Sequence, residues 1–124
     1  MPLAAGVAVC GVLGVLARYG LDSLIEQRSE SVFPWATFTI NVSGCLAVGF
    51  FIAALVDRHR MPQWIRTGLV VGFCGGFTTF STFAQETLDL FEEGDHAVAV
   101  ATIGANVILG LGAVWLGARL GRTV

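Results

Sequence analysis

The sequence predicts an all-α membrane protein with four transmembrane helices, the third of which is broken. Hydrophobic residues make up 55% of the 124 residues, charged residues only 13%, and the mean hydropathy is +0.76. This composition is outside the range of soluble globular domains. Apolar stretches long enough to cross about 30 Å of hydrocarbon recur along the chain. Residues 1–124 are therefore expected to form one membrane domain.

Short polar connections separate the apolar stretches. The first stretch follows no basic residues and precedes further spans, so it is interpreted as a transmembrane helix and not as a cleaved signal peptide. Pro34 and Pro62 stand just before the second and third stretches, where proline suits a first helical turn. The four spans are expected at about residues 3–25, 35–56, 64–91 and 97–120.

The third span carries an unusual polar segment near its middle. Two adjacent glycines weaken a helix, and four hydroxyl residues follow in the sequence Gly75-Gly76-Phe77-Thr78-Thr79-Phe80-Ser81-Thr82-Phe83. Such polarity at membrane depth is costly unless it is buried in protein or lines a polar path. The spacing places Phe80 and Phe83 on one helix face. A permeation path is indicated, although hydroxyls in membrane helices also bond carbonyls four residues earlier.

Glycine spacing predicts close helix contact and association. Gly68, Gly72 and Gly76 recur every fourth residue, which lets helix backbones approach each other. Four spans alone enclose little interior, and a pore needs more walls. A dimer or a larger assembly is therefore favoured.

Four polar residues in the spans are candidates for function. Asn41 could donate to an anion or form an interhelical hydrogen bond, and Asn106 has the same two interpretations with packing favoured. Glu86, one turn after Thr82, is a candidate pore acid or a residue of a water-filled vestibule. Arg18 interrupts an apolar run and could attract anions or mark the interface.

Charge and cysteine usage narrow the function further. The net charge of −2 and the isoelectric point near 5.5 argue against a nucleic-acid partner. The three cysteines lie in apolar segments without a CxxC pair or a neighbouring histidine, so they are expected to be reduced packing residues. No enzymatic activity is expected.

With these motifs in place, the chain resembles the Fluc/CrcB family of fluoride channels over essentially its whole length. The resemblance depends on the length, the four spans and one motif in each of the first three spans. These motifs are Gly11…Gly14…Ala17-Arg18-Tyr19, Asn41-Val42-Ser43-Gly44, and the glycine-hydroxyl segment from Gly75 to Phe83.

The resemblance implies a fluoride-selective channel of the cell (inner) membrane that passively lowers cytoplasmic fluoride. Family members are antiparallel, dual-topology dimers with two pores along the subunit interface. By resemblance, Phe80 and Phe83 would line the pores with their ring edges, and Asn41 would donate to fluoride. Ser81 and Thr82 would belong to a polar track. Glu86 and Arg18, identified above, are added to this pore set.

The resemblance also implies a structural sodium ion that is not transported. The backbone carbonyls of Gly75 and Thr78, from both subunits, would hold it at the break. A break in a helix frees carbonyl oxygens, and these suit a hard cation.

Two features depart from the family pattern. Family members often carry a tyrosine and a serine on the fourth helix, where this chain has Thr102 and Asn106, so no fourth-helix site is carried over. The arginines are also unevenly placed, and the bias favours cytoplasmic termini. A dual-topology homodimer is expected to have little such bias. The expected partners are therefore lipid, fluoride, and either a second copy, if the bias is too weak to act, or an oppositely oriented paralogue. Five arginines lie on the side of the second connection and the C-terminus, against Arg18 and Arg28 on the other: Arg58, Arg60, Arg66, Arg119 and Arg122.

Two other functions remain open at this stage. A small proton- or cation-coupled multidrug-type transporter subunit also uses about four spans, and Glu86 is the only acid more than a turn inside a span core. A non-transporting assembly subunit would use the glycines and hydroxyls only for packing.

Overall fold

The computed structural model describes residues 2–124, and these residues form helices and short connections without any strand. Four helices in this range are long and apolar enough to cross a membrane: Leu3–Arg28, Trp35–Val56, Gln63–Glu92 and His96–Arg122. The predicted fold class of four membrane helices is thereby confirmed.

Only the first of these spans is a single uninterrupted α-helix. The first span is α1 (Leu3–Arg28), and the second is α2 (Trp35–Phe51) followed by the π-helical turn η1 (Ile52–Val56). The third span comprises α3 (Gln63–Thr67), η2 (Gly68–Cys74), α4 (Gly75–Phe77) and α5 (Phe80–Glu92). The fourth comprises α6 (His96–Gly104), η3 (Ala105–Leu109) and α7 (Gly110–Arg122).

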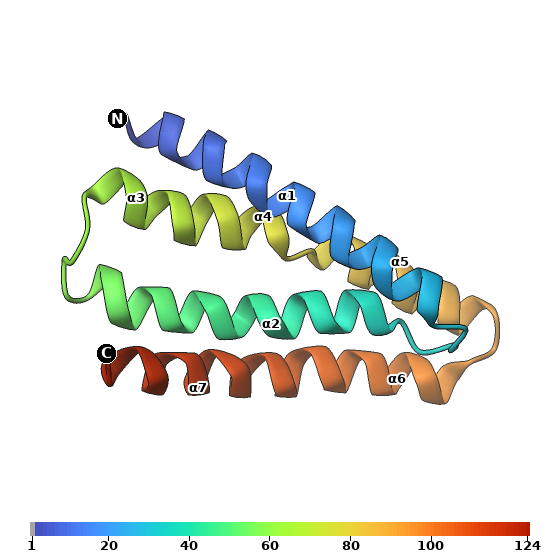
Figure 1. Ribbon diagram of the computed structural model, residues 1–124. Helices are drawn as coiled ribbons and strands as arrows, with labels where there is room; N and C mark the ends of the chain where they lie inside the picture. Colours follow the sequence, from blue (N-terminus) through green and yellow to red (C-terminus); the bar gives the residue numbers. More distant parts are fainter. Residues whose placement is uncertain (1) are drawn as a thin grey trace.

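The spans form two packed pairs (Figure 1). Helix α2 lies against α7, and α1 lies against η2 and α4. Both chain ends and the α2–α3 connection lie at one end of the bundle, while the α1–α2 and α5–α6 connections lie at the other (Figure 1).

Glycine makes both pairings possible. A Cβ atom added to Gly72 would lie 2.6 Å from the carbonyl oxygen of Val7 in α1. A Cβ added to Gly14 would overlap the backbone of Phe73 in η2, and one added to Gly117 in α7 would overlap Leu46 in α2. The close helix contact predicted from the glycine spacing is therefore confirmed, since any side chain at these positions would separate the backbones.

The third span is interrupted just after the glycine pair. Gly75 keeps helical angles (φ −64°, ψ −38°), and α4 continues to Phe77. Thr78 (φ −82°, ψ 157°) and Thr79 (φ −146°, ψ 113°) are extended before α5 begins. The glycines weaken the helix, but the break falls on the two threonines, whose side chains bond the adjoining helix ends.

Two hydroxyl groups stabilise the ends of the break. The Thr78 hydroxyl donates to the carbonyl oxygen of Cys74 at 2.9 Å, and Thr79 Oγ1 accepts from the Thr82 N–H at 3.3 Å. Thr79 is thus the N-cap of α5, a position at which threonine stabilises a helix. The bond to a carbonyl four residues earlier, considered from sequence for the hydroxyls, is therefore present at Thr78 and not at Thr79.

Candidate functional site

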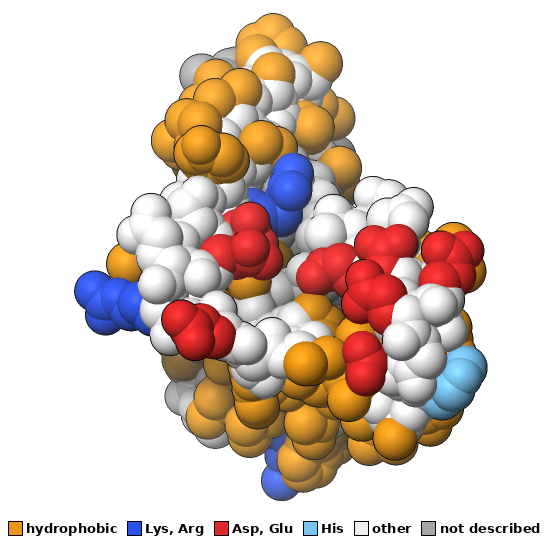
Figure 2. All heavy atoms as spheres, turned by 90° about the vertical axis from the view of Figure 1, so that its right-hand side faces the viewer, with side chains coloured by type: hydrophobic (Ala, Val, Ile, Leu, Met, Phe, Trp, Pro, Cys, Tyr) orange, Lys and Arg blue, Asp and Glu red, His pale blue; other side chains and the backbone are white. Residues whose placement is uncertain are grey.

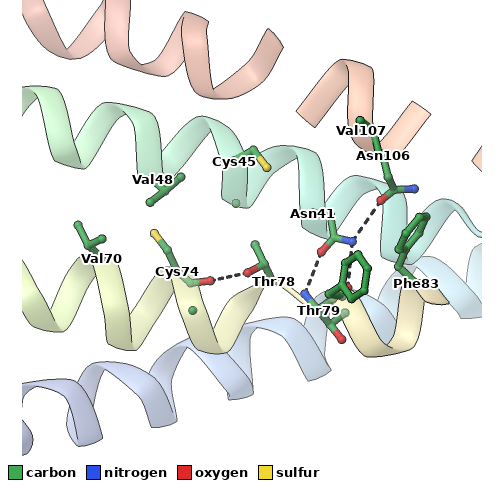
Figure 3. Close-up of a pocket in the computed structure, with 13 residues that line it drawn as sticks. Asn41, Cys45, Val48, Val70, Cys74, Thr78, Thr79, Phe83, Asn106 and Val107 are labelled. Carbon is green, nitrogen blue, oxygen red and sulfur yellow. Dashed lines mark hydrogen bonds between the residues drawn. The ribbon is translucent and has the colours of Figure 1, made fainter. Parts of the chain in front are cut away.

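A cavity of about 380 Å³ lies beside the break, between α2, the third span and η3. Its polar wall consists of Asn41, Thr78, Thr79 and Asn106, and Phe80 and Phe83 close one side. Figure 3 shows the two asparagines and Thr79 directed toward one another, with Phe83 beside them. The structure therefore brings three predicted pore residues, Asn41, Phe80 and Phe83, to one cavity.

Asn41 hydrogen-bonds both backbone groups of Thr79, one of the two extended residues of the break. The Thr79 N–H donates to Asn41 Oδ1 at 2.9 Å, and Asn41 Nδ2 donates to the Thr79 carbonyl oxygen at 3.1 Å. This two-point pairing replaces helix bonds that Thr79 cannot make, which matters where no water is available.

Hydrogen bonds between side-chain amides connect Asn41 to the fourth span. Asn41 Nδ2 also donates to Asn106 Oδ1 at 3.1 Å, and Asn106 Nδ2 donates to the Thr102 carbonyl oxygen at 2.9 Å. Both Nδ2 hydrogens of Asn41 are therefore engaged. Donation from Asn41 to an anion remains a prediction, and it requires one of these bonds to open.

The two pore phenylalanines differ in exposure. Phe80 is 78% exposed, whereas Phe83 is 9% exposed. Their ring centroids lie 5.6 Å apart and their planes are tilted by 57°. Phe83 is thus buried within the chain, while Phe80 presents its ring to the outside.

Ser81 and Thr82 lie apart from this wall. Both side chains are exposed, and neither lines the cavity. The Thr79 hydroxyl donates to Thr82 Oγ1 at 3.0 Å, within the capping turn of α5. A polar track at these residues remains a prediction.

Glu86 belongs to a second, polar pocket of about 240 Å³ near one end of the bundle. The Thr37 hydroxyl donates to Glu86 Oε1, and Thr37 is only 2% exposed. The same pocket contains Glu26 and the serines of the α1–α2 connection. Glu86 and the Asn41 cavity are thus two separate sites, and sequence reasoning did not identify Thr37. Its position one helical turn before Asn41 was the available signal.

Arg18 reaches the break from α1. Its Nε donates to the Gly76 carbonyl oxygen at 3.1 Å. The guanidinium group therefore lies beside α4 and stabilises a carbonyl at the helix end, where cations are favoured.

The break directs two helix donors away from their usual acceptors. The Thr79 N–H, which would bond Gly75 in a helix, donates to Asn41; the Thr82 N–H, which would bond Thr78, donates to Thr79 Oγ1. A Cβ added to Gly75 would meet nothing within 4 Å. The carbonyls of Gly75 and Thr78 thus fit the ligand set expected for a hard cation.

The end of the bundle that carries the α1–α2 and α5–α6 connections is strongly acidic. Figure 2 views this end and shows carboxylates gathered around a hollow. The carboxylates come from the ends of α1 and α5 and from the α1–α2 and α5–α6 connections: Asp22, Glu26, Glu30, Asp89, Glu92, Glu93 and Asp95.

Comparison with known proteins identifies the family. Residues 5–118 match the model of the family described as CrcB-like protein, Camphor Resistance (CrcB). The chain is 44% identical over 116 residues to "Fluoride-specific ion channel FluC 2" of Symbiobacterium thermophilum, covering 94% of each chain. It is 42% identical over 118 residues to "Fluoride-specific ion channel FluC" of Nitratidesulfovibrio vulgaris, covering 95% of each. The similarity spans all four membrane helices, and the chain therefore belongs to the CrcB-like family of multi-pass membrane proteins.

Proposed function

We propose that this protein is a fluoride-selective ion channel that lets fluoride leave the cell down its gradient. The observation that carries the proposal is the cavity at the break, whose polar wall is made of neutral groups and whose side is closed by two phenylalanines. Similarity to proteins named fluoride-specific ion channels along almost the whole chain supports the same function.

Neutral donors favour fluoride over larger anions for a physical reason. Fluoride is small and accepts hydrogen bonds strongly, so amide and hydroxyl donors can replace much of its hydration. The positive edges of Phe80 and Phe83 add attraction without a fixed cation. A pore lined by arginine would bind chloride as well, because plain charge does not discriminate between small anions.

We propose that the functional unit is an antiparallel dimer with a structural sodium ion at the break. Phe80 is exposed in the single subunit, and Gly75 faces open space. Both observations support a second copy or paralogue packing at this point. Carbonyls of Gly75 and Thr78 from two subunits would hold the ion, which neutralises backbone oxygens that the break leaves without helix donors.

The charge distribution supports an oppositely oriented partner. In an antiparallel pair, the acidic end of one subunit would lie at the same membrane surface as the arginine-rich end of the other. Arg18 bonds the break and so does not act as a flanking charge, which leaves Arg28 alone against five arginines at the other end. Reporter fusions at the C-terminus will distinguish a second copy from a paralogue: a homodimer requires both orientations.

A proton-coupled transporter is the second candidate, and the Glu86 pocket is the observation that favours it. An intramembrane acid beside further carboxylates is typical of proton pathways. A coupled transporter would accumulate fluoride against its gradient when a proton gradient is applied. A channel would only dissipate the fluoride gradient.

Flux from liposomes tests the proposal and separates the candidates. Purified protein is reconstituted into vesicles loaded with potassium fluoride or potassium chloride, and efflux starts when valinomycin releases the potassium. The proposal expects fluoride to leave and chloride to stay. Equal loss of both anions, no loss of fluoride, or uphill fluoride movement driven by a pH step would each reject it.

A further inference from the structure

The chain contains only two asparagines, Asn41 and Asn106, and the structure joins them to each other. They come from the second and fourth spans and meet in the cavity at the break (Figure 3). Each amide orientation is fixed by its partners, because Asn41 Oδ1 accepts from a backbone N–H and Asn106 Nδ2 donates to a backbone carbonyl.

The hydrogens of Asn41 are fully used. An amide nitrogen has two hydrogens, and those of Asn41 go to the carbonyl oxygen of Thr79 and to Asn106 Oδ1. An anion that accepts a hydrogen bond from Asn41 must therefore displace one of these two acceptors.

The two acceptors are not equally easy to displace. Asn41 pairs with Thr79 at two points, so releasing Thr79 would leave a backbone N–H and a carbonyl unpaired at membrane depth. The bond to Asn106 is a single contact, and Asn106 remains tethered to the Thr102 carbonyl after it opens. The hydrogen shared with Asn106 is thus the one that an anion can take.

We infer that Asn106 lowers anion affinity by competing with the anion for one hydrogen of Asn41. The inference rests on the proposed function. Fluoride accepts hydrogen bonds more strongly than chloride does, because it is smaller and more basic, so it displaces the amide oxygen more readily. The competition admits fluoride at the cost of some affinity.

The direction in which substitutions of Asn106 change the affinity for fluoride tests this role. Asn106→Ala removes the competing oxygen, so the fluoride concentration at half-maximal initial efflux is expected to fall about threefold, the equivalent of an average interhelical hydrogen bond in a membrane protein. Asn106→Asp strengthens the competing acceptor with a negative charge and is expected to raise the half-maximal concentration.

Val107→Ala is the matched control, since it removes side-chain volume from the same cavity wall without touching the amide chain. The inference is overturned if Asn106→Ala raises the half-maximal concentration or leaves it unchanged, or if Val107→Ala lowers it equally. A channel that conducts fluoride but gives any of these results retains its proposed function and loses only this role for Asn106. Protein that conducts no fluoride before substitution fails the proposed function itself.

A second measurement uses the unsubstituted protein and does not depend on a variant folding. Labelling with ¹³C,¹⁵N-asparagine gives two side-chain amide nitrogen signals besides two backbone ones. A ¹³C-carbonyl label in Ile40 or Ala105 identifies the backbone nitrogen of the asparagine that follows each, and through-bond correlation links it to the side-chain amide. Fluoride is expected to shift the signals of both Asn41 and Asn106 along one saturation curve, while the same concentration of chloride leaves them in place. The inference is contradicted if fluoride moves neither signal, or moves that of Asn106 alone.

Discussion

At the scale of single residues, the two candidate pore phenylalanines differ in how deeply they are buried. Phe83 is 9% exposed and Phe80 is 78% exposed, although both border the same cavity. Phe83 is therefore part of the subunit interior as well as of the candidate pore. Phe80 has little contact within the chain, and its proposed contribution is to the pore or to a partner subunit.

Replacing each ring with isoleucine separates its contribution to fluoride efflux from its contribution to stability. Phe80→Ile is expected to leave the melting temperature of the protein nearly unchanged and to reduce fluoride efflux at least tenfold, because isoleucine lacks a positive ring edge. Phe83→Ile is expected to lose efflux and also about 1–2 kcal/mol of stability, since it leaves a buried gap. Efflux from liposomes and thermal unfolding in detergent measure the two effects. Normal conduction by both variants would reject the ring-edge hypothesis.

Thr79 is the residue on which the break depends most. Its backbone pairs with Asn41, and its hydroxyl caps α5. Thr79→Val keeps the shape and the β-branch but removes the cap, so stability is expected to fall by about 1 kcal/mol. Thr79→Ser restores a capping oxygen and is the matched control, with unfolding in detergent as the measurement. Equal losses for valine and serine would show that the cap is not the source of the effect.

At the scale of elements, glycine defines how α1 meets the third span. A Cβ added to Gly14 would overlap the backbone of Phe73, whereas one added to Gly20, on the same helix, would meet nothing within 4 Å. The two positions share a helix and a residue type, and they differ only in what faces them.

Alanine at these two positions gives a matched test. Gly14→Ala forces the helices apart and is expected to destabilise the protein by about 1–3 kcal/mol, the usual cost of overpacking. Gly20→Ala is expected to be neutral or slightly stabilising, because alanine favours a helix over glycine. Melting temperatures compared under one detergent condition check both. A destabilising effect at Gly20 as large as that at Gly14 would contradict the packing account.

The elements differ in how far the sequence predicted them. Hydropathy predicted the four spans, because each must match a bilayer, and the glycine pair with the hydroxyl residues after it predicted a break in the third. The glycine pair was a poor guide to the exact position of that break, since Gly75 remains helical and the two threonines carry it. The π-helical turns η1, η2 and η3 were not predicted from the sequence.

The candidate site was predictable only in part. The spacing placed Phe80 and Phe83 on one helix face, and the family resemblance assigned Asn41 to the same pore; the structure brings all three to one cavity. The partners of the polar groups were not predictable, because Thr37 bonds Glu86 across 49 residues and Asn41 bonds Asn106 across 65. Such pairings depend on how the spans pack, which no local pattern encodes.

At the scale of the whole molecule, the break is the expected point of contact between two subunits. Dimer stability should therefore depend on sodium, since carbonyls of Gly75 and Thr78 from both subunits would otherwise face each other. Dilution of the dimer in detergent is expected to favour monomers when sodium is replaced by an equal concentration of N-methylglucamine. Dissociation constants that are the same in both cations would reject the sodium site.

The central claim is fluoride selectivity, and the reversal potential of the reconstituted channel tests it most directly. With a tenfold gradient of fluoride across a planar bilayer and equal chloride on both sides, current is expected to reverse at about 59 mV, the value for a single permeant monovalent ion. With equal fluoride on both sides and a tenfold gradient of chloride, the reversal potential is expected to be zero. A reversal potential near zero under the fluoride gradient, or one that follows chloride, would contradict the account.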